Sequence, residues 1–148
     1  MTTAKQQSPT LVVTRFIPFP RERVFDAWLD AKRLAQFMHP GNNGRSTVET
    51  DARVGGKFRI VMHHAKTPPE GVLHTGEYLL IERPSRLVFT WLSIPTENRA
   101  TTVTVEFEER PGGTEVVLTH VGLPSTQVEG HRRGWGEILG LLESAGVS

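Results

Sequence analysis

Four of the six histidines could form a polar cluster inside the folded chain: His64, His74, His120 and His131. His64 and His74 flank one predicted hairpin loop, so they can be neighbours on adjacent strands. His120 shares its strand parity with apolar residues, and His131 precedes Trp135 by one helical turn. Because imidazole titrates near neutral pH, the cluster could bind a ligand oxygen or act as an acid or base. Structural hydrogen bonding beneath the helix is the alternative, and the sequence leaves both open.

A second candidate is the pair Glu77 and Tyr78 in the middle of a predicted strand. Neighbouring residues of a strand point to opposite faces, so one of the two must point inward. A buried Glu77 would have a raised pKa and could serve as a general acid or base. The alternative places Tyr78 in the core and Glu77 in solvent, and we favour this second arrangement.

The sequence contains no established metal-binding or catalytic motif. The histidines lie on separate predicted elements and lack the His-x-Glu or His-Glu-x-x-His spacing, so we expect no metal. A nucleophile elbow, a phosphate-binding loop and a dinucleotide fingerprint are also missing. The glycines Gly55 and Gly56 lead into a strand rather than a helix, and we interpret them as turn residues. We therefore name no catalytic residue and expect no cofactor.

Composition narrows the class of protein further. The 17 Lys and Arg residues nearly balance the 16 Asp and Glu residues, which argues against nucleic-acid binding. The absence of cysteine excludes disulfides, iron–sulfur clusters and thiolate chemistry. Apolar runs are far shorter than the roughly 20 residues of a membrane-spanning helix, and the first sixteen residues do not have the pattern of a signal peptide. We expect a cytoplasmic protein without a membrane span.

Hydrophobic periodicity predicts an α+β domain. Residues 1–9 are expected to be a loose tail, and residues 10–148 a single domain. Alternating apolar residues predict strands at 10–17, 45–51, 57–64, 72–82, 86–92, 101–108 and 114–121. A short helix starting at Pro20 and a second one capped by Asp30 follow the first strand, and a long helix runs from Ser125 or Gln127 to Ala145. The consecutive strands should form a bent sheet, and only the last helix is long enough to cover its concave face.

Six short motifs carry a resemblance to a known family. In chain order they are Gly55-Gly56-Lys57-Phe58, His74-Thr75-Gly76-Glu77-Tyr78, Arg86-Leu87-Val88-Phe89-Thr90-Trp91, Thr102-Val103-Thr104-Val105, Gly113-Thr114-Glu115-Val116 with Leu118-Thr119-His120, and His131-Arg132-Arg133-Gly134-Trp135. Together they resemble the single-domain relatives of the activator of heat-shock-protein-90 ATPase, within the START-like (SRPBCC) superfamily. The similarity covers residues 10–145. It implies a helix-grip fold: a curved antiparallel sheet of six to seven strands holding a long C-terminal helix, with two short helices after the first strand.

The resemblance also implies a cavity between the C-terminal helix and the sheet. Many relatives carry a pair of Trp residues before a Pro, whereas this chain has Phe37-Met38-His39-Pro40, so we expect a different cavity mouth. Candidate ligand-binding residues are the inward-facing aromatic, methionine and histidine side chains: Trp28, Phe37, Met38, Phe58, Met62, Tyr78, Phe89, Trp91, His120, His131 and Trp135.

The leading hypothesis is binding of a small, mostly apolar or aromatic molecule in that cavity. One alternative is an enzyme of cyclase or hydrolase type that uses His120, His131 or Glu77. Another is a protein-interaction module related to the chaperone activators by descent. We favour a binding protein over an enzyme. The expected partner is a small hydrophobic ligand and not nucleic acid. The sequence leaves open whether the protein forms a homodimer.

Overall fold

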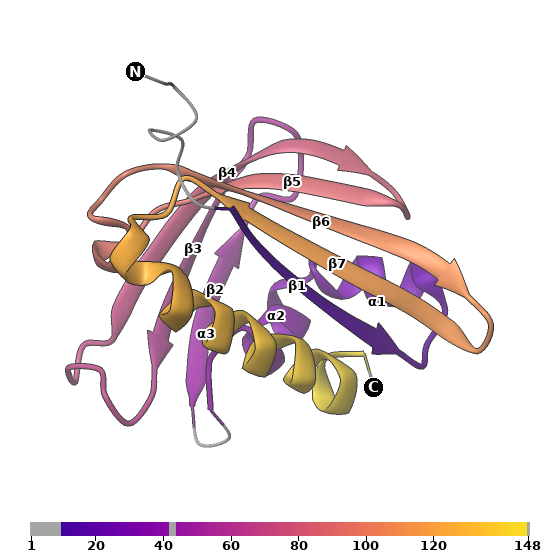
Figure 1. Cartoon of the computed structure of the whole chain (residues 1–148), viewed down its shortest axis with the longest axis horizontal. Coiled ribbons are helices and arrows are strands. Elements are labelled where there is room, and N and C mark those ends of the chain that lie inside the picture. Colours follow the sequence, from indigo (N-terminus) through magenta and orange to yellow (C-terminus); the bar gives the residue numbers. More distant parts are fainter. Residues whose placement is uncertain (1–9, 42–43, 148) are drawn as a thin grey trace.

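A computed structural model describes residues 10–41 and 44–147, which form a curved seven-stranded antiparallel sheet with helices on its concave side (Figure 1). The strands are β1 (Thr10–Ile17), β2 (Arg45–Thr50), β3 (Lys57–His63), β4 (Val72–Glu82), β5 (Arg86–Trp91), β6 (Thr101–Arg110) and β7 (Gly113–Val121). The α-helices are α1 (Arg21–Ala27), α2 (Ala31–Phe37) and α3 (Val128–Leu141). The expected tail, residues 1–9, lies outside the described residues.

The strand order is β1-β7-β6-β5-β4-β3-β2, so β2 to β7 form a meander and β1 pairs with the last strand. This arrangement confirms the predicted helix-grip fold. The expected helix over 125–145 is continuous but not uniform, because a 3-10 turn (Ser125–Gln127) precedes α3 and a π-helical turn (Leu142–Gly146) follows it. A short 3-10 turn at Ile94–Thr96 was not foreseen from the sequence. Among the described residues, no helix has both the length and the apolar character needed to cross a membrane.

Alternation along the strands places the apolar side chains beneath α3. Val103, Val105 and Phe107 of β6 are buried, whereas Glu108 is exposed, as the period of two predicts. Helix α3 contributes Trp135 and other apolar side chains of one stripe to the same core. The helix therefore covers the concave face rather than the convex one (Figure 1).

The two short helices fill one part of the concave face. The side chain of Asp30 caps α2 by accepting a hydrogen bond from the Lys32 amide at 2.9 Å, as the sequence predicts. Trp28 follows α1 and packs edge-on against Phe37 and Phe107, with ring centroids 5.3 and 6.4 Å away. Aromatic side chains thus close this end of the concavity, and the remaining space lies at the opposite end of α3.

Strand β4 pairs with β3 over residues 72–77 and with β5 over residues 78–82. Its register with β5 shifts between Tyr78 and Leu80. Gly76 lies just before this shift, and the ring of Phe58 and the carbonyl of Thr90 occupy the place a side chain would take. A glycine within a strand often marks such an irregularity or close approach.

Candidate ligand-binding cavity

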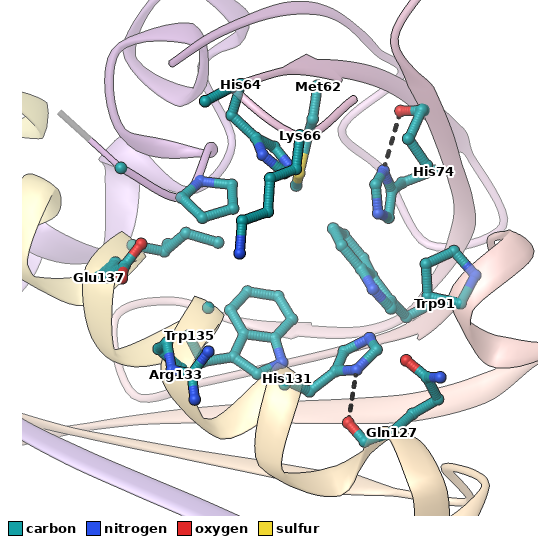
Figure 2. A pocket seen from close by; sticks show the side chains of 18 residues that line it. Met62, His64, Lys66, His74, Trp91, Gln127, His131, Arg133, Trp135 and Glu137 are labelled. Atoms are coloured by element: carbon teal, nitrogen blue, oxygen red, sulfur yellow. Dashed lines mark hydrogen bonds between the residues drawn. The ribbon is translucent and has the colours of Figure 1, made fainter. Parts of the chain in front are cut away.

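A cavity of about 440 Å³ lies between the first turns of α3 and the β3–β4 end of the sheet (Figure 2). Its apolar wall consists of Met62 from β3, Val72 from β4, Trp91 from β5, and Trp135 and Ile138 from α3. A volume of this size lies within the range of small-molecule sites. The site is therefore assembled from segments that are far apart in the sequence and that the sheet and α3 bring together.

Two glycines leave this space open. Gly130 and Gly134 line the cavity from α3, and a Cβ atom at either position would have no heavy atom within 4 Å. Glycine inside a helix costs roughly 0.5–1 kcal/mol relative to alanine. The helix thus carries two unfavourable residues where it lines the cavity.

A chain of hydrogen bonds supports the two tryptophans of the cavity. The indole N–H of Trp135 donates to Nδ1 of His120 at 3.0 Å, because an indole nitrogen can only donate. In its neutral form His120 then carries its proton on Nε2 and donates it to the Thr101 hydroxyl at 2.7 Å. That hydroxyl in turn donates to the carbonyl of Trp91 at 2.6 Å. Every donor in this chain has an acceptor, so the relay fixes the tautomer of His120 and the orientation of Trp135.

His120 therefore holds Trp135 in place and does not itself line the cavity. It is fully buried, and burial lowers its pKa to about 3, with nearby His131 adding to the effect. Both of its ring nitrogens are already engaged. Of the two roles that the sequence leaves open for this residue, the structure shows hydrogen bonding beneath the helix.

Three other histidines line the cavity itself: His64, His74 and His131. His131 donates from Nδ1 to the carbonyl of Gln127 at 2.9 Å, and His74 donates from Nδ1 to the carbonyl of Val72 at 3.1 Å (Figure 2). Burial lowers the pKa of His74 to about 4 and also lowers the pKa of His131. Both rings are therefore neutral at pH 7.

Charged side chains surround the opening of the cavity. Lys66, Arg133 and Glu137 are exposed and belong to its lining. Figure 2 shows the ammonium end of Lys66 reaching over the cavity from the loop between β3 and β4. The site thus has an apolar interior, neutral imidazoles in its wall and mixed charge at its rim.

Four of the eleven residues proposed from the sequence line this cavity: Met62, Trp91, His131 and Trp135. A second void of about 10 Å³, too small for a ligand, is surrounded by Trp28, Met38, Phe58, Tyr78 and Phe89, together with Trp91. Phe37 and His120 are packed in the core. A ligand-binding role stays a prediction for all eleven residues, and the structure places only the first four at the cavity.

Tyr78 is the inward member of the Glu77–Tyr78 pair and is 3% exposed, whereas Glu77 is half-buried and does not line the cavity. The segment that departs from the family pattern reaches the site only through Pro40, followed by Gly41. Within residues 10–41 and 44–147, no three His, Asp or Glu side chains are grouped so that they could hold a metal ion.

The sequence patterns did not indicate several residues of the lining, including Val72, Gln127, Gly130 and Gly134. The glycines were detectable, because two glycines four residues apart inside a predicted helix point to an open or closely approached face. The loop residues of the lining, such as Ala65 and Lys66, were not detectable, since the pattern of a single strand does not show which loop will fold over α3.

Comparison with known proteins identifies the family. A family model described as "Activator of Hsp90 ATPase homolog 1-like protein" matches residues 18–146. The chain belongs to this family. The match confirms the resemblance inferred from the six motifs.

Solved structures of similar proteins share the fold of this family member. A protein from Chromobacterium violaceum is 25% identical, with a TM-score of 0.81 over 92% of this chain and 96% of that one. A protein from Rhizobium leguminosarum is 29% identical, with a TM-score of 0.72 over 93% of each chain. An HSP90 activator from Plasmodium falciparum is 28% identical, with a TM-score of 0.59 over 78% of this chain and 74% of that one. Among curated proteins, none matches the sequence.

Proposed function

We propose that this family member binds a small, mostly apolar or aromatic molecule in the cavity between α3 and the sheet. The observation that carries the proposal is the cavity of about 440 Å³ whose wall contains two indole rings and which Gly130 and Gly134 leave open. A helix that serves only stability would gain from alanine at those two positions. Retaining glycine there is consistent with a space that is used.

The wall of the cavity favours an aromatic ligand. The rings of Trp91 and Trp135 have centroids 5.0 Å apart and planes inclined by 52°, so they form a continuous aromatic surface. His74 continues that surface, with its ring centroid 4.9 Å from that of Trp91. Flat ligands gain from offset or edge-on contact with such rings in addition to the burial of apolar area.

The chemistry of the lining favours binding over catalysis. The lowered pKa values of His74 and His131 make both imidazoles weak bases at neutral pH. Glu137 is the carboxylate among the lining residues, and it is exposed at the rim. These features support a binding protein in preference to a cyclase or hydrolase.

A pair of helix variants tests the proposal. Gly134→Phe should fill the cavity, whereas Gly136→Phe alters the same helix outside the lining, and a Cβ at either position has no heavy atom within 4 Å. We expect naphthalene, measured by calorimetric titration, to bind the natural protein saturably with one molecule per chain. Gly134→Phe should weaken binding at least about ten-fold, and Gly136→Phe should leave it unchanged.

Thermal melting separates binding from misfolding. Both variants should melt cooperatively, since replacing a helical glycine tends to stabilise a helix. A natural protein that melts cooperatively and does not bind naphthalene would contradict the proposal, as would equal loss in both variants. Native mass spectrometry of the freshly purified protein would additionally reveal a non-covalent adduct and its mass.

A further inference from the structure

Trp91 contributes a hydrogen-bond donor that the fold does not use. The side chain is 2% exposed, and its indole nitrogen Nε1 is buried without a hydrogen-bond partner among the described residues. Trp91 lines the cavity, and its backbone carbonyl, not its ring, takes part in the relay that ends at Trp135. A buried N–H without an acceptor is unfavourable, so a group that accepts this bond gains from it.

His131 contributes the complementary acceptor. Its Nδ1 atom donates to the carbonyl of Gln127, so in the neutral ring the lone pair is on Nε2. The structure gives this Nε2 no hydrogen-bond partner among the residues it describes. The side chain is half-buried and belongs to the cavity lining.

Both groups lie at the same end of the cavity. The ring of His131 is 5.4 Å from that of His120, which is hydrogen-bonded to Trp135, and the ring of Trp135 is 5.0 Å from that of Trp91. A charge on His131 would also act on His74, whose ring packs on Trp91. Figure 2 shows the imidazole of His131 and the indole of Trp91 on one side of the cavity.

We propose that the ligand is an aromatic molecule with a hydroxyl group, which accepts a hydrogen bond from Nε1 of Trp91 and donates one to Nε2 of His131. A hydroxyl is both donor and acceptor and so satisfies both groups at once. An ether or ketone oxygen can only accept and would leave Nε2 of His131 unsatisfied, and an ammonium group could not accept from Trp91. The inference rests on the proposed function and specifies the chemical class of the ligand.

Four probes that share one ring system test this inference: naphthalene, 2-naphthol, 2-methoxynaphthalene and 2-naphthoate. The hydroxyl of 2-naphthol, like that of tyrosine, is neutral at pH 7. We expect calorimetric titration at pH 7 to give 2-naphthol an affinity roughly five- to ten-fold higher than naphthalene, the usual gain from well-formed hydrogen bonds. The methoxy compound should bind more weakly than 2-naphthol, because its oxygen cannot donate.

Three variants assign the effect to the two residues. His131→Phe and Trp91→Phe should each lose the preference for 2-naphthol over naphthalene, measured as the ratio of the two affinities within each variant. His63→Phe replaces a histidine of β3 that does not belong to the lining and should keep the preference. Each Phe variant retains an aromatic side chain, and Trp91→Phe leaves no new unsatisfied partner because Nε1 has none.

The possible results separate this inference from the proposed function. Equal binding of naphthalene and 2-naphthol would overturn the hydroxyl inference and leave the apolar cavity intact. Tightest binding of 2-naphthoate would also overturn it, and would assign recognition to the cations Lys66 and Arg133 at the rim. Loss of the preference in His63→Phe but not in His131→Phe would contradict the assignment. Absence of binding by all four probes would refute the proposed function itself, and the hydroxyl inference with it.

Discussion

Acidification from pH 7 to pH 5 should destabilise this protein by several kcal/mol, because two buried histidines are held neutral in the folded state. His74 is 7% exposed and His120 is fully buried, and burial is the main cause that lowers their pKa values to about 4 and about 3. In the unfolded chain both would titrate near 6.5. Below pH 6.5 the unfolded state therefore binds more protons than the folded state, and stability falls as the pH falls.

The loss in the free energy of unfolding follows from the gap between the folded and unfolded pKa values of the two histidines. Each unit of pH between the folded and unfolded pKa values is worth about 1.4 kcal/mol for each histidine. A pH of 5 lies about 1.5 units below the unfolded pKa of each histidine and above its folded pKa. Each histidine therefore lowers the free energy of unfolding by about 2 kcal/mol at this pH. The two together should lower the free energy of unfolding by about 4 kcal/mol, and His131, whose pKa is also lowered, acts in the same direction.

Urea unfolding followed by far-ultraviolet circular dichroism at pH 7, 6 and 5 measures this loss. His74→Phe removes one of the two groups and keeps an aromatic ring against Trp91, so its loss between pH 7 and pH 5 should be about 2 kcal/mol. Met62→Leu changes the same cavity wall without removing a titratable group and should keep the full loss. A natural protein that loses less than about 1 kcal/mol over this range would refute the reasoning, as would a His74→Phe variant with the full loss.

Three substitutions test the framework that positions the cavity, each by urea unfolding. Gly76→Val should destabilise the protein by about 2 kcal/mol or more, because the carbonyl of Thr90 occupies the space for a side chain; an unchanged free energy of unfolding would contradict this. Thr101→Val should cost about 1–3 kcal/mol, since it leaves Nε2 of His120 without its acceptor, and a neutral result would show that the relay contributes nothing to stability. Asp30→Ala should cost about 1 kcal/mol by removing the cap of α2, and no loss would mean that the cap is dispensable.

Much of the fold was predictable because its determinants are local. The alternation of Val103, Val105 and Phe107 assigns both the strand and its buried face, and Asp30 marks the start of a helix by its capping chemistry. A glycine among large residues of a strand, such as Gly76, likewise indicates an irregularity or a close approach. These signals depend on a few neighbouring residues, so they survive without any knowledge of tertiary structure.

The division between packed core and open cavity was not predictable in the same way. Strand parity points Phe58 and Met62 to the same concave face, yet Phe58 packs under the aromatic cluster near Trp28 and Met62 lines the cavity. The difference depends on where α1 and α2 settle on the sheet. The partners of His120 were equally hidden, because a strand pattern shows that a side chain points inward but not which donor meets it.

Nuclear magnetic resonance of the protein with naphthalene shows directly whether a ligand enters the cavity. Intermolecular nuclear Overhauser effects report which side chains contact the bound probe. We expect contacts from the naphthalene protons to the methyl groups of Met62 and Ile138, which line the cavity from β3 and α3. Contacts confined to exposed apolar side chains, such as Phe16 of β1, would contradict this expectation.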